Sequence, residues 1–133
     1  MLSRYFLSVG AFFGATGVIL GAFAAHGLKG ALSPYLLDVF KTGVFYQLIH
    51  SIALILACVL SFMTSGNPEA QKYFNRSGFC FTIGILCFSG SLYLLAMTGV
   101  KWFGPVTPVG GLFFIIGWIM ILIAAFKMKE VSL

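Results

Sequence analysis

Four polar side chains crowd into the middle of an otherwise apolar stretch of the chain: Tyr46, Gln47, His50 and Ser51. Spacings of three and four residues place them on one side of a helix. An imidazole or a primary amide inside a membrane is costly unless it finds a hydrogen-bond partner. We therefore expect this side of the helix to point into the protein, with His50 facing a neighbouring side chain rather than lipid.

Two further residues are candidates to join this group. His26 closes the first apolar stretch on the side of the membrane where the next helix begins, so it is predicted to approach His50. Tyr93 lies deep in a later stretch, and its hydroxyl needs a partner such as Gln47 or His50. The alternative for His26 is a helix C-terminus, with Gly27 as a left-handed cap. The predicted polar core is His26, Gln47, His50, Ser51 and Tyr93.

Several chemistries are open to such a core. Haem ligation needs two imidazoles at one depth, whereas His26 and His50 differ by as much as about 10 Å. A zinc site needs further ligands, and Asp38 is the one carboxylate nearby. Ion coupling normally uses a carboxyl group inside the membrane, and the apolar stretches have none. We favour a structural hydrogen-bond cluster and predict no catalytic residue, no metal site and no cofactor.

The composition identifies the environment of these residues. Charged residues make up 8% of the 133 residues and hydrophobic residues 60%, whereas soluble domains carry about 25% charged residues. Such a chain is an integral membrane protein. Its net charge of +5 does not indicate nucleic-acid binding, because the basic residues flank the apolar stretches. Cys58, Cys80 and Cys87 lie within those stretches and are expected to act as small apolar side chains.

The order of apolar stretches and capping residues predicts four transmembrane helices. Ser33-Pro34, Asn67-Pro68 and Thr107-Pro108 each combine an N-cap residue with a proline that suits the first turn. The N-terminal stretch is too long for a signal peptide and is taken as a retained span. Short connections make neighbouring helices antiparallel. The prediction is an all-α, integral membrane, antiparallel four-helix bundle, one domain over 1–133, with helices at about 3–25, 34–64, 68–98 and 108–127.

A stripe of glycines marks the packing surface of the first helix. Gly10, Gly14, Gly17 and Gly21 share one face at spacings of four, three and four residues. Lipid gives helices no hydrophobic reason to associate, so small residues that allow close contact mark an interface. We expect the stripe to pack within the chain, with a second copy of the protein as the alternative.

Basic residues predict the orientation in the membrane. The flanking basic residues fall into two groups, one on each side of the membrane. The group that contains Arg4 is the larger, and the positive-inside rule places the larger group in the cytoplasm. Both termini are therefore predicted to be cytoplasmic. The larger group is Arg4, Lys72, Arg76, Lys127 and Lys129, and the smaller is Lys29, Lys41 and Lys101.

Four motifs together resemble the YgdD/YwdK-type family of small bacterial membrane proteins. They are GAFAAHGLK at 21–29, FKTGVFYQLIHSIAL at 40–54, SGSLYLL at 89–95 and TPVGG at 107–111. Ala24 departs from the family pattern, which usually has glycine there. The resemblance implies a four-helix protein of the bacterial plasma (inner) membrane, related to a small eukaryotic transmembrane protein. It implies no activity, because the family is a domain of unknown function.

Three functions remain open. The leading hypothesis is a non-enzymatic scaffold or accessory subunit that binds a membrane lipid, a hydrophobic ligand, a membrane-protein partner or a second copy of itself. The second is a small transporter or channel that uses the His/Gln cluster, which requires a polar cavity leading to one face. The third is haem or quinone binding.

Overall fold

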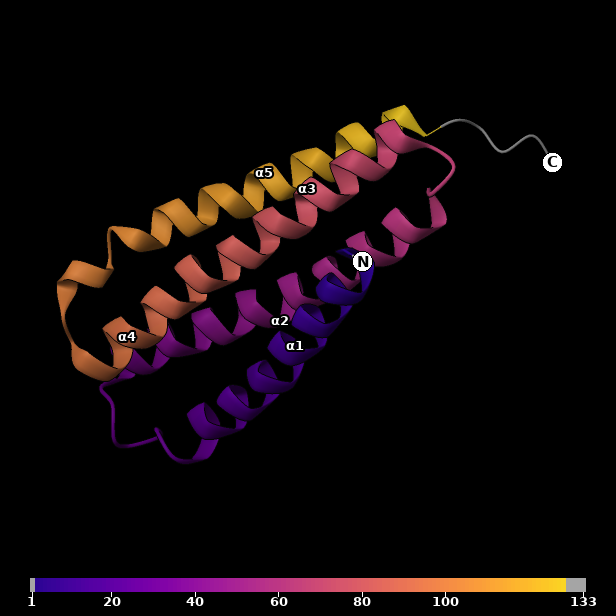
Figure 1. Cartoon of the computed structure of the whole chain (residues 1–133). Coiled ribbons are helices and arrows are strands. Elements are labelled where there is room, and N and C mark those ends of the chain that lie inside the picture. Colours follow the sequence, from indigo (N-terminus) through magenta and orange to yellow (C-terminus); the bar gives the residue numbers. More distant parts are fainter. Residues whose placement is uncertain (1, 129–133) are drawn as a thin grey trace.

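The computed structural model describes residues 2–128, and Lys129 of the orientation argument lies outside them. Four helices long and apolar enough to cross a membrane fill this part of the chain, which confirms the predicted antiparallel bundle (Figure 1). The elements are α1 (Leu2–His26), α2 (Pro34–Met63), α3 (Pro68–Gly84), a π turn η1 (Ile85–Ser89), α4 (Gly90–Thr98), a 3-10 turn η2 (Lys101–Phe103) and α5 (Val106–Lys127). The third predicted span is thus α3, η1 and α4 in succession.

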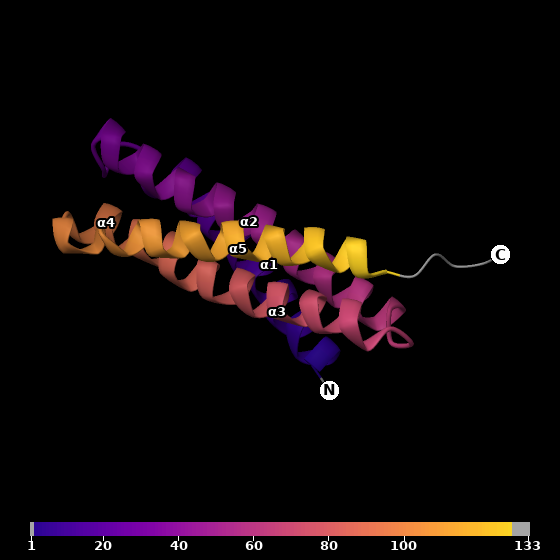
Figure 2. The same ribbon diagram turned by 90° about the horizontal axis from the view of Figure 1, so that it is seen from above.

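The helices form an open row rather than a closed square. α1 packs mainly on α2, α2 packs on α3 and α4, and α5 packs on α3 and η1. Figure 1 shows α1 and α5 as the two outer members of the row. In the view of Figure 2, the axis of α2 is inclined to that of α5. α1 begins and α5 ends at the same end of the bundle. Because α1 has one main neighbour, much of its surface stays open to lipid.

The glycine stripe of α1 packs against α2 of the same chain, as expected. A Cβ atom added at Gly10 would lie 2.7 Å from Cγ1 of Ile55, and one at Gly17 would lie 2.7 Å from Cδ2 of Leu48. The remaining two glycines face Ser51 and Val44 in the same antiparallel order. Because glycine has only a hydrogen atom as its side chain, the two helices approach closely at these positions. The close approach supplies dispersion contact where no hydrophobic force acts.

A second close approach joins α5 to the π turn. Gly110 lies against the backbone of Phe88, and an added Cβ would come within 2.7 Å of Cα of Phe88. The π turn widens the helix locally by one residue and changes which side chains face each neighbour. Ser89, at its end, donates a hydrogen bond of 2.7 Å to the carbonyl of Gly43 in α2. The turn is therefore held by α5 on one side and α2 on the other.

Two of the three predicted helix starts are confirmed. The side chain of Ser33 accepts a bond from the Leu36 amide, and that of Asn67 accepts one from the Ala70 amide. The third is wrong, because α5 begins at Val106 and Thr107 lies inside its first turn. The Thr107 hydroxyl instead shares a 2.7 Å hydrogen bond with Ser91 of α4. A proline at 108 is tolerated there because the first turn needs no amide donor from it.

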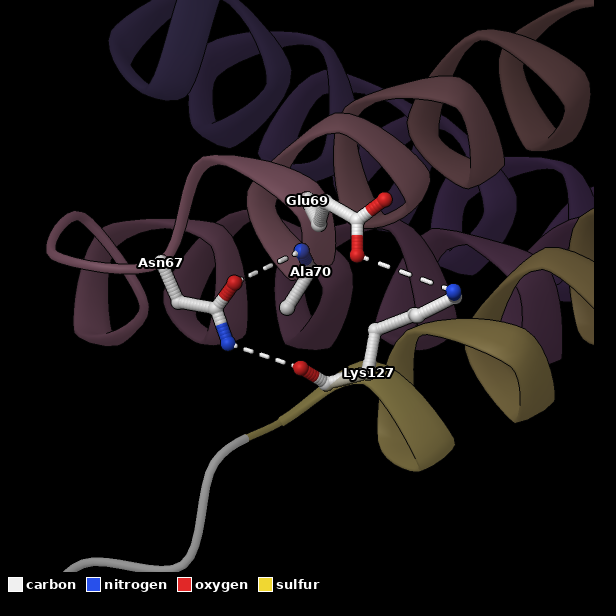
Figure 3. Close-up of polar contacts among 4 residues, drawn as sticks. All are labelled: Asn67, Glu69, Ala70 and Lys127. Atoms are coloured by element: carbon white, nitrogen blue, oxygen red, sulfur yellow. Dashed lines mark hydrogen bonds and ion pairs between the residues drawn. The ribbon is translucent and has the colours of Figure 1, made fainter.

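Asn67 joins two helix ends (Figure 3). Its Oδ1 atom accepts from the Ala70 amide at 3.3 Å, while its Nδ2 atom donates to the carbonyl of Lys127 at 2.8 Å. The amide thus caps the start of α3 and the end of α5 together. Lys127 also lies 3.6 Å from Glu69, an exposed ion pair that contributes little to stability.

We predict that Gly110→Ala destabilises the protein by about 1–3 kcal/mol, the usual cost of overpacking. The new methyl group meets backbone atoms of Phe88, which cannot rotate away. Gly111→Ala is the matched control, since its Cβ would lie 3.7 Å from the Phe88 ring in ordinary contact. Thermal unfolding in one detergent measures both variants, and equal loss in the two would contradict the close approach.

We also predict that Asn67→Ala lowers the stability by about 1–2 kcal/mol, because it removes an N-cap. Asn67→Asp keeps the oxygen that caps α3 but loses the donor to the Lys127 carbonyl. Its unfolding midpoint should lie between those of the wild type and Asn67→Ala. An Asp variant as unstable as the Ala variant would show that the contact with α5, not the cap, dominates.

Candidate functional site

Gln47 is the centre of a buried hydrogen-bond network between α1, α2 and α4. Its Nε2 atom donates to the carbonyl of Phe13 and to Oγ1 of Thr16, both at 2.9 Å. Its Oε1 atom accepts the hydroxyl hydrogen of Tyr93 at 2.7 Å, which confirms the predicted partnership of Tyr93. The Gln47 side chain is 3% exposed. A single amide therefore links three helices in a region where unpaired polar groups are strongly disfavoured.

A groove lies over this network, on the side where α1 diverges from η1 and α4. Its volume is about 240 Å³, and both Gln47 and Tyr93 line it. Phe12 and Leu86, at its edges, are largely exposed, so the groove opens sideways toward lipid. The full lining is Phe12, Phe13, Thr16, Leu20, Gln47, Ile85, Leu86, Gly90 and Tyr93. The groove thus combines apolar walls with a polar floor in the middle of the span.

His50 faces inward as predicted, but into a different environment. Its ring stacks on Phe114 of α5 with the ring centroids 3.6 Å apart. The Nδ1 atom lies 2.8 Å from the carbonyl of Tyr46, and Nε2 accepts the indole hydrogen of Trp118 at 3.2 Å. A carbonyl can only accept and an indole N–H can only donate, so the ring is neutral with its hydrogen on Nδ1. Both nitrogens of His50 are occupied within an aromatic layer.

The predicted meeting of five polar residues is therefore wrong in part. His26 is exposed at the end of α1, where its Nδ1 atom lies 2.9 Å from the carbonyl of Ala22. Gly27 is not its left-handed cap, because the glycines with positive φ are Gly30 and Gly99. Ser51 is buried but donates to the carbonyl of Leu48 and faces the glycine stripe. Of the five residues, the structure brings Gln47 and Tyr93 together.

Two partners were missed in the sequence. Thr16 sits between the stripe glycines Gly14 and Gly17, where a polar side chain within a packing surface signals a cross-helix bond. Trp118 lies well inside the last apolar stretch rather than at its edge, where tryptophan usually anchors to the interface. An indole N–H inside the membrane needs a hydrogen-bond acceptor, so the position of Trp118 indicates a buried partner such as His50.

Comparison with known proteins supports the predicted resemblance. The family described as a protein of unknown function (DUF423) matches residues 20–111. A UPF0382 membrane protein of Staphylococcus aureus (strain bovine RF122 / ET3-1) is 44% identical over 93% of this chain and 97% of its own length. The UPF0382 membrane protein YwdK of Bacillus subtilis (strain 168) is 40% identical over 93% of this chain and 98% of its own length. No solved structure matches the chain.

We predict that Trp118→Phe destabilises the protein by about 1–3 kcal/mol, because it leaves Nε2 of His50 without a donor. The ¹⁵N resonance of Nε2 should shift in the variant, while Nδ1 stays protonated. Trp102→Phe is the control, since Trp102 is 86% exposed and should change the stability by less than about 0.5 kcal/mol. A wild-type spectrum with the hydrogen on Nε2 would contradict the assigned contact.

Proposed function

The chain belongs to the DUF423 family of membrane proteins of unknown function, and from that premise we propose that it is a non-enzymatic binding protein. It takes one hydrophobic molecule from the membrane into the groove between α1 and α4. The observation that carries this proposal is a lipid-facing groove with Gln47 and Tyr93 on its floor. Sites for small molecules commonly combine apolar walls with a few placed polar groups.

The depth of the groove supports a membrane-dissolved ligand. Thr16 lies about 15 Å along α1 from His26, at about 1.5 Å per residue. The hydrocarbon core of a bilayer is about 30 Å thick, so the polar floor sits near its middle. A water-soluble molecule would have to cross lipid to reach it. A molecule already dissolved in the bilayer enters sideways between Phe12 and Leu86.

The two rival functions have less support. Conduction needs a polar path, but the groove shares no lining residue with the 470 Å³ cavity near Lys101 or the 280 Å³ cavity near Arg4. Haem or metal ligation through His50 would require breaking the bond that Nε2 accepts from Trp118. His26 is exposed and lies apart from His50, so a bis-imidazole site between them is not favoured.

The proposed setting is the bacterial plasma membrane with both termini in the cytoplasm. The relatives named above are bacterial membrane proteins, and the distribution of basic residues favours this orientation. In this arrangement Arg4 and Lys127 lie at the cytoplasmic end and Lys101 at the outer end. The groove then opens to the hydrocarbon core near the middle of the bilayer.

We predict that Gly90→Leu abolishes binding without unfolding the protein. A Cβ atom at Gly90 has no described atom within 4 Å, so a larger side chain extends into the groove instead of into a neighbour. Native mass spectrometry of protein purified in a mild detergent should show a bound small molecule on the wild type. Its occupancy should fall at least tenfold in Gly90→Leu.

Ala22→Leu provides the control, since Ala22 is exposed on α1 and does not line the groove. This variant should keep wild-type occupancy. A bound mass that survives Gly90→Leu, or that falls equally in Ala22→Leu, would place the ligand elsewhere.

A further inference from the structure

The hydrogen bonds under the groove all run in one direction. The Tyr93 hydroxyl donates to Oε1 of Gln47, and Nε2 of Gln47 donates to Oγ1 of Thr16. The Thr16 hydroxyl in turn donates to the carbonyl of Phe12 at 2.8 Å. We call this chain of hydrogen bonds, from Tyr93 through Gln47 and Thr16, the relay. Each donated hydrogen in it points away from Tyr93 and toward the backbone of α1.

The direction is fixed at the α1 end. The Phe13 carbonyl can only accept, so the Gln47 atom beside it must be the nitrogen, and the amide cannot be reversed. The Phe12 carbonyl likewise fixes the hydroxyl hydrogen of Thr16. Both hydrogens of the Gln47 amide are then used, and Oε1 is left to accept from Tyr93.

At the other end of the relay, Tyr93 keeps acceptor capacity on its oxygen. Its single hydrogen is committed to Gln47. The neighbouring Ser89 hydroxyl donates to the carbonyl of Gly43 and also lies within hydrogen-bonding reach of the Tyr93 hydroxyl, so it occupies at most one of the two lone pairs on the Tyr93 oxygen. A phenol oxygen accepts as well as donates, and Tyr93 lines the groove. The floor of the groove therefore offers lone pairs rather than hydrogens.

We infer that the ligand is a hydroxyl-terminated membrane lipid, a long-chain alcohol whose O–H donates to the Tyr93 oxygen. This inference rests on the proposed function and names the chemical class of its ligand. A volume of about 240 Å³ holds the polar end and the first carbons, and the rest of the chain extends into the bilayer. The apolar walls formed by Phe12, Leu20 and Leu86 suit such a chain.

A ligand that can only accept is disfavoured on the same grounds. To bind an ether or a ketone, the Tyr93 hydroxyl would have to turn away from Gln47. Oε1 of Gln47 would then lose the partner it has in the middle of the membrane, and an unpaired buried acceptor is costly. The relay thus selects donors over acceptors without any charged group.

Farnesol and farnesyl methyl ether test this inference, since they share a chain and differ in the terminal hydrogen. Native mass spectrometry with increasing probe concentration gives an apparent Kd for each in detergent micelles. Wild-type protein should bind farnesol at least tenfold more tightly than the ether. Gly90→Leu should lose both probes, and Ala22→Leu should behave as the wild type.

Thr16→Val separates the relay from simple packing. Valine keeps the branched shape but removes the oxygen that accepts from Gln47, which frees one amide hydrogen toward the groove. The ether should then bind more tightly, and the ratio of the two Kd values should fall toward one. Thr16→Ser keeps the acceptor and should keep the wild-type ratio.

The outcomes distinguish this inference from the proposed function. If the wild type binds both probes equally and Gly90→Leu loses both, the groove binds ligands but the donor rule is wrong. If the ratio is unchanged in Thr16→Val, the relay does not set the preference and the inference is overturned. If neither probe binds the wild type, the inference is overturned, and if Gly90→Leu does not weaken the binding of either probe, both proposals are wrong.

Discussion

Close backbone contact at glycine positions is the constraint on which the rest of the structure depends. Lipid surrounds the helices with a medium as apolar as their own side chains, so association must come from dispersion and hydrogen bonds. Gly10 and Gly17 bring α1 onto α2, and Gly110 brings α5 onto the π turn. Each contact secures one outer helix of the row to a central one. α2, with half of its most apolar segment buried, carries the greater share of the packing.

The groove follows from where those glycines lie. The stripe occupies one side of α1, and the adjoining side carries Phe12, Thr16 and Leu20, which are too large for a second close contact. α1 therefore follows α2 and separates from η1 and α4. Gln47 crosses the remaining space with two hydrogen bonds to α1 and one to Tyr93. The same amide that stabilises the separated helices also makes the floor of the opening polar.

Hydropathy and capping residues were sufficient to predict the four spans and two of the three helix starts, but among the polar side chains they predicted the partner of Tyr93 and not those of the histidines. Gln47 and His50 are three residues apart, which suggests one cluster, yet at 3.6 residues per turn they differ by about 60° around α2. That angle directs Gln47 toward α1 and His50 toward α5. His26 shares a membrane side with the start of α2, but its side chain is exposed at the end of α1. Such choices depend on crossing geometry, which residue spacing does not contain.

Gln47 and His50 of α2 are both polar, but they differ in how readily a molecule from the membrane can reach their hydrogen-bond partners. His50 is enclosed by Phe81, Phe114 and Trp118, and both of its nitrogens are satisfied within the protein. A ligand would have to displace an aromatic ring to reach it. Gln47 is as deeply buried, but Tyr93, which donates to it, also lines the groove. Burial alone therefore singles out both residues. Access from the lipid-facing groove singles out the side of α2 that carries Gln47.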